Sequence, residues 1–128
     1  MKRDIETRAD IDELLGEFYK IVPFDNEIGH HFDGVDVSSH IPVIADFWEK
    51  VLFGNAVYFG NPMTVHELLH KKSPLKLKHF ARWVEIFGRT VDRLFEGEMA
   101  DNAKLRAEMI GHSLNQRLNG GIQIQGTV

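Results

Sequence analysis

The sequence contains no cysteine, and this absence excludes several classes of site at once. Without thiols the chain can form no disulfide, no zinc site with thiolate ligands and no iron–sulfur cluster. An excess of basic residues is also missing, because 15 Lys and Arg stand against 19 Asp and Glu, for a net charge of −4. Nucleic-acid-binding domains usually carry a basic face, so we expect no nucleic-acid partner.

Long apolar runs are lacking as well. No stretch approaches the roughly 20 apolar residues that a membrane-spanning helix needs. The first ten residues, MKRDIETRAD, are charged rather than apolar and do not form a signal peptide. We therefore expect a soluble, cytoplasmic protein with no membrane partner.

What the chain does have is an abundance of aromatic and imidazole side chains. Its 128 residues correspond to one domain, which we expect to span residues 1–128. Nine Phe and seven His are present. They fit either an aromatic core with surface histidines or an apolar pocket with imidazole ligands.

Apolar residues recur at helical spacing along most of the chain, and no convincing pair of strands is present. The predicted fold class is therefore all-α. Asp10 and Glu13 form a capping box for the first helix, and proline or glycine separates the later ones. Residues 119–128 are expected to be a frayed tail. The predicted helices span residues 10–22, 39–53, 62–70, 75–95 and 98–118, with one or two tight helical turns near 26–32.

The stretch His66–His70, HELLH, fits the H-E-x-x-H pattern of zinc proteases. In that pattern a helix places two imidazoles on one face, and the glutamate activates water. The extended form of the pattern is absent here, because Ser73 and Lys76 replace its glycine and its third histidine. A distant carboxylate such as Glu85 could still supply a third ligand. A zinc metallohydrolase is therefore a remote alternative.

A wider pattern surrounds this stretch. The segments GEFYKIV, IGHHF, HIPVIADFWEKVL, YFGNPMTVH and HFARWVEIF occur in this order. Together they resemble the group III truncated hemoglobins, the short bacterial globins, over about residues 8–118. The most specific part is Y-x-G-x-P-x-x-x-H followed by H-F-x-R-W. The resemblance implies a globin-like, two-over-two helical sandwich around one heme b.

The resemblance also implies roles for individual residues. His66 matches the proximal histidine that ligates the heme iron. On the opposite, distal side, Tyr19, His40 and Trp83 match the residues that stabilise a bound ligand. Pocket-lining positions are matched by Phe18, Phe32 and Ile44.

Physical chemistry supports such roles for these residue types. A neutral imidazole is a strong axial ligand, and its second nitrogen should donate to a backbone carbonyl, which fixes the ring. Tyr19 and Trp83 supply an O–H and an N–H donor, and two donors over one ligand would hold dioxygen tightly and polarise it. Pro42, close behind His40, could turn His40 toward solvent.

The carboxylates of a heme need partners at the mouth of its pocket. The candidates in this sequence are Tyr58, Lys78, His79 and Arg82. We expect His30, His31 and His112 to lie on the surface.

The predicted function is therefore a heme-b truncated hemoglobin that binds O2, NO and CO. Tight distal hydrogen bonding suits redox chemistry, such as NO dioxygenation or peroxide handling, better than O2 transport. Such turnover would need a reductase as a partner. The alternative is a non-catalytic O2 or NO binder or sensor, although the sequence has no output domain.

Overall fold

The computed structural model describes residues 2–120, and within that range it contains helices and no strand. The all-α prediction is confirmed. None of these helices is long and apolar enough to cross a membrane. The elements are α1 (Arg8–Ile21), η1 (Val22–Phe24), η2 (Gly29–Phe32), α2 (Val37–Phe53), α3 (Pro62–Lys72), α4 (Leu77–Leu94), α5 (Glu98–Asn115) and η3 (Gln116–Gly120).

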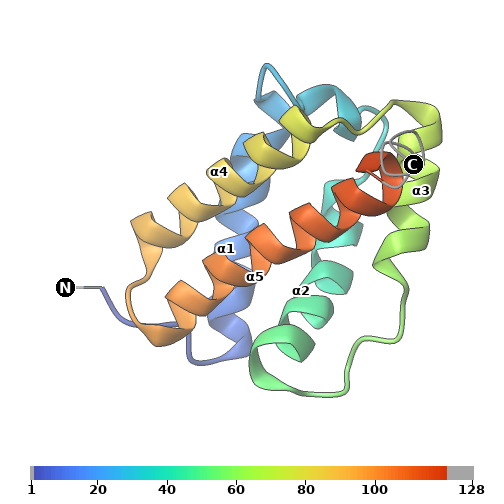
Figure 1. Cartoon of the computed structure of the whole chain (residues 1–128). Coiled ribbons are helices and arrows are strands. Elements are labelled where there is room, and N and C mark those ends of the chain that lie inside the picture. Colours follow the sequence, from blue (N-terminus) through green and yellow to red (C-terminus); the bar gives the residue numbers. More distant parts are fainter. Residues whose placement is uncertain (1, 121–128) are drawn as a thin grey trace.

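Four helices form two packed pairs. Helix α1 packs along α2, and α4 packs along α5; the pairs meet where α1 contacts α4 and α2 contacts α5 (Figure 1). This is the predicted two-over-two sandwich. Helix α3 lies at one edge of the fold and is reached from α2 by an extended loop (Figure 1). The space between α3 and the sandwich is where the candidate site lies.

The start of α1 differs from the prediction. The helix begins at Arg8, with Thr7 as its N-cap, so Asp10 is the third helical residue rather than the cap. The Asp10 carboxylate is buried and accepts the backbone N–H groups of Glu6 and Thr7 at 2.8 and 3.0 Å. Asp10 therefore supplies the acidic member of a capping box built with Thr7.

Other helix ends shift by a few residues. Helix α2 begins at Val37, so Pro42 lies in its second turn rather than its first. Helix α5 ends at Asn115 and continues as the π-helical turn η3, so residues 119 and 120, predicted as tail, belong to that turn. The rest of the predicted tail lies outside the described residues.

An aromatic stack connects the two helix pairs. The ring of Phe87 lies between Trp48 and Trp83, with centroids 4.9 and 5.6 Å away and nearly parallel planes. Phe18 packs edge-on against Phe87 at 5.5 Å. Buried aromatic pairs of this kind stabilise a core beyond the area that they bury. The stack forms the rigid base beneath the candidate site.

Candidate functional site

A cavity of about 400 Å³ opens between α2, α3 and α4. Its volume falls within the roughly 300–1,000 Å³ typical of small-molecule and cofactor pockets. Its walls are mainly Val, Ile, Leu and Phe side chains, with a few polar groups among them. The polar or amphipathic side chains at the cavity are Tyr19, His31, His40, Trp48, Tyr58, His66, His79 and Trp83.

His66 reaches this cavity from α3, whose start is set by the local sequence. The Asn61 side chain caps the helix by accepting the N–H groups of Met63 and Thr64. Pro62 occupies the first helical position, where the missing N–H has no consequence. These residues place His66 in the second turn.

The Nδ1 atom of His66 lies 2.7 Å from the Pro62 carbonyl oxygen. Because a carbonyl can only accept, Nδ1 carries the proton and Nε2 carries a lone pair. Burial lowers the pKa of His66, and the bond to Pro62 opposes that effect only in part. The ring is therefore neutral and oriented, as a metal-ligating imidazole is.

Two hydrogen-bond donors, Tyr19 and Trp83, line the same cavity. Among the described residues, neither the Tyr19 hydroxyl nor the Trp83 indole N–H has a hydrogen-bond partner, and neither atom is fully buried. The Tyr19 ring is held edge-on by Phe18 and Phe32, with centroids 5.0 and 5.8 Å away. Burial raises the pKa of Tyr19, so its hydroxyl keeps its proton. Both donors are available to a ligand.

His40 lies at the cavity in the first turn of α2, and its side chain is exposed. The possibility that Pro42 turns it toward solvent agrees with this exposure. Its position suits the entrance of the cavity better than its interior.

The remaining predicted residues divide into two groups. Phe32, Ile44, Tyr58 and His79 line the cavity, whereas Phe18, Lys78 and Arg82 do not. Phe18 is fully buried in the aromatic stack, behind Tyr19. Lys78 is exposed.

Arg82 has a different partner from the one expected. Its guanidinium donates to Asp25 at 2.7 Å and pairs with Glu85 at 2.5 Å. It therefore joins the turn before η2 to α4. Sequence reasoning also placed His31 on the surface, but the structure places it half-buried at the cavity. Its contacts come from the distant α4 region, so no local pattern could have revealed this.

The HELLH stretch does not assemble a zinc site. The Nδ1 atom of His70 accepts the backbone N–H of Leu75 at 2.9 Å, and that of His66 donates to Pro62. Across residues 2–120, the one group of three His, Asp or Glu side chains close enough to share a metal excludes both His66 and His70. Glu67 is exposed.

The site thus combines an apolar cavity with one imidazole that is able to ligate a metal. One neutral imidazole lone pair faces the cavity from α3, and two free donors come from α1 and α4. Residues 4–116 match the sequence profile of the bacterial-like globins. The chain belongs to the bacterial-like globin family. This globin is accordingly a heme-binding protein that takes small diatomic ligands such as O2.

A relative of known type agrees with this membership. The globin is 27% identical to the group 3 truncated hemoglobin of Campylobacter jejuni over 124 residues, which cover 92% of this chain and 95% of that protein. The crystal structure of the group III truncated hemoglobin from Campylobacter jejuni superposes with a TM-score of 0.82, over 92% of this chain and 95% of the other.

Proposed function

We propose that this globin binds heme b through His66, holds dioxygen with Tyr19 and Trp83, and acts in redox chemistry on bound gases rather than in oxygen transport. The observation that carries the proposal is the pair of unpartnered donors at the cavity that also contains the free Nε2 of His66. Heme iron supplies reversible binding of diatomic gases and one-electron chemistry when an imidazole ligates it.

The proposed tight binding of dioxygen follows from the chain's own residues. Tyr19 and Trp83 come from different helices, and the Phe18–Phe87–Trp48 packing fixes their rings. Donors held in place before the ligand arrives need no rearrangement when negative charge develops on it. The apolar walls lower the polarity around the donors, so each hydrogen bond is stronger than it would be in bulk water.

Two reactions fit this arrangement. In the first, dioxygen, nitric oxide and one electron combine to give nitrate. In the second, hydrogen peroxide, two electrons and two protons give two molecules of water. Both need an external electron donor, for which a reductase is the expected partner. A slow oxygen release favours the first reaction over transport, because a carrier must unload its oxygen, and the same donors can polarise a bound peroxide in the second.

The test is steady-state consumption of nitric oxide, and separately of peroxide, by the heme-loaded protein with a flavin reductase and NADH. We expect turnover that depends on the protein and falls at least tenfold when Tyr19 becomes Phe and Trp83 becomes Phe together. Oxygen binding without catalysed consumption of either substrate would favour a non-catalytic binder or sensor. Free heme with the same reductase provides the background rate.

A further inference from the structure

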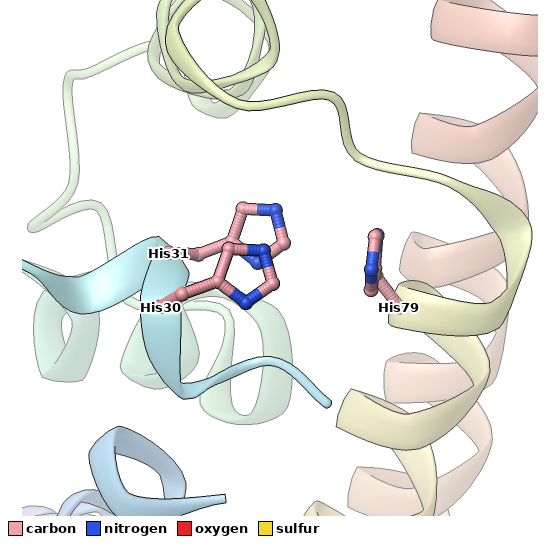
Figure 2. A group of neighbouring side chains, drawn as sticks. All are labelled: His30, His31 and His79. Carbon is pink, nitrogen blue, oxygen red and sulfur yellow. The ribbon is translucent and has the colours of Figure 1, made fainter. Parts of the chain in front are cut away.

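A cluster of three histidines lies at the rim of the cavity. His30 and His31 come from η2, and His79 comes from the first turn of α4; the three rings face one another (Figure 2). One nitrogen from each ring lies within 4.8 Å of the others. The rings of His30 and His31 overlap with centroids 4.0 Å apart, and His79 meets His31 edge-on at 4.7 Å. His31 and His79 line the cavity, and His79 is buried.

The hydrogen bonds of this cluster determine where its ring protons lie. The backbone N–H of Lys76 donates to Nδ1 of His79 at 3.0 Å, so the proton of the neutral His79 ring is on Nε2. The Pro74 carbonyl lies 3.3 Å from Nε2 of His31, so that nitrogen donates and Nδ1 is the free one. His79 therefore offers an N–H donor without having to be protonated.

The charged side chains that act on His79 are positive. Burial lowers the pKa of His79, and His31, Lys78, His30 and Lys76 lower it further by repulsion. Both lysines are exposed, and neither forms an ion pair within residues 2–120. The repulsion by these positive groups, unlike the burial, favours an anion beside His79.

The same features argue against a metal ion in this cluster. The lone pair of His79 that lies on Nδ1 is already used by the Lys76 N–H. A cation would also be repelled by Lys76 and Lys78.

We propose that His31 and His79, with His30 beside His31, form a carboxylate-binding site that holds a propionate of the heme at the rim of the cavity. This inference rests on heme b being the cofactor of the proposed function. Nε2–H of His79 donates to the carboxylate oxygen. The free Nδ1 of His31 and the carboxylate share one proton, which makes the second hydrogen bond. His30 and Lys78 add positive charge from the solvent side.

The experiment compares two cofactors in the full-length protein: heme and its dimethyl ester, in which both carboxylates are neutral and cannot accept a charge-assisted bond. The rate of transfer to an excess of a heme-scavenging apoprotein is measured in phosphate-free buffer at pH 7. The proteins are the wild type, His31→Ala, His79→Ala and, as a surface control, His112→Ala, whose histidine is exposed on α5.

We expect heme to leave His31→Ala and His79→Ala about tenfold faster than it leaves the wild type, and the ester to leave all four proteins at similar rates. His79 also caps α4, and damage to the helix would accelerate both cofactors equally; that result overturns the proposal. An unchanged heme rate in both variants overturns it as well. So does stoichiometric binding of Zn²⁺ to the heme-loaded wild type that is lost in His31→Ala.

These outcomes are separate from those of the proposed function. If Tyr19 and Trp83 have no effect on oxygen release or turnover, the proposed redox role fails while the cofactor comparison stands. If heme is retained on His66 but the ester is retained equally well, the carboxylate site fails while the oxygen chemistry stands. Absence of any heme binding by the wild type would refute both.

Discussion

Replacing Tyr19 with Phe removes one hydroxyl and leaves the ring in place. The packing of that ring against Phe18 and Phe32 does not involve the oxygen, so the cavity should keep its shape. The hydroxyl has no protein partner to lose among the described residues. The substitution therefore isolates one donor directed at a bound ligand.

The expected magnitude follows from the chemistry of that donor. A hydrogen bond to a charged or partly charged acceptor contributes about 1.5–3 kcal/mol, and about 1.4 kcal/mol is a factor of ten. Loss of the bond should therefore accelerate oxygen dissociation about 10- to 100-fold. Burial raises the pKa of Tyr19, so the hydroxyl stays protonated, and the ratio of the two rates should be the same at pH 6 and pH 9.

The assay is stopped-flow mixing of the oxygenated protein with excess carbon monoxide, which gives the oxygen dissociation rate. Carbon monoxide provides an internal control, because it carries far less negative charge when bound and should respond much less to the substitution. An oxygen off-rate within threefold of the wild type would show that Tyr19 does not donate to the ligand, and the argument for tight distal binding would lose its main support.

Three further predictions concern the iron-ligating residue His66, the cap of α5 and the turn η2, which carries His30 and His31. His66→Gly should lose the Soret band of an imidazole-ligated heme, and added imidazole should restore it; an unchanged spectrum would mean that another residue ligates. Asp4 accepts the N–H groups of Met99 and Ala100 at the start of α5, so Asp4→Ala should lower the free energy of unfolding by about 1 kcal/mol, whereas exposed Glu108→Ala should not. Burial raises the pKa of Asp4, but its backbone N–H bonds outweigh this and lower the pKa overall. The carboxylate therefore stabilises the fold fully above its unfolded pKa of about 3.9. The difference between wild type and variant, followed by denaturant unfolding, should shrink below that value and be lost as pH falls through the lower pKa of the folded state. Gly29→Ala would place a Cβ 2.5 Å from the Pro23 carbonyl oxygen, so heme retention should fall as η2 shifts, while Gly16→Ala, with open space around its Cα, should leave it unchanged.

Much of the fold follows from patterns within single helices. Within residues 2–120, the helical spacing of apolar residues located α1, α2, α4 and α5, and Pro62 located α3; the predicted ends lie within a few residues of the observed ones. The orientation of His66 is also local, because its Nδ1 partner is the carbonyl of Pro62 one helical turn earlier. These features depend on residues three or four apart, so the sequence alone is enough to predict them.

Two neighbouring residues of α1 show a feature that the sequence alone does not predict. Phe18 and Tyr19 are adjacent, and both were expected at the pocket, but successive side chains point about 100° apart around a helix. The packing of α1 against α4 decided that Phe18 enters the core and Tyr19 faces the cavity.

The remaining differences from the prediction involve contacts between segments that lie far apart in the chain. Arg82 pairs with Asp25, 57 residues away, instead of reaching the cavity. His31 contacts His79, which is 48 residues away in the sequence. His31 was expected on the surface, but this contact places it at the rim of the cavity. The sequence by itself determined the helices and the orientation of the His66 ring, because contacts within one or two turns set these. Only the tertiary structure decided which side chains share the cavity, because helix packing brings together residues with no local relation.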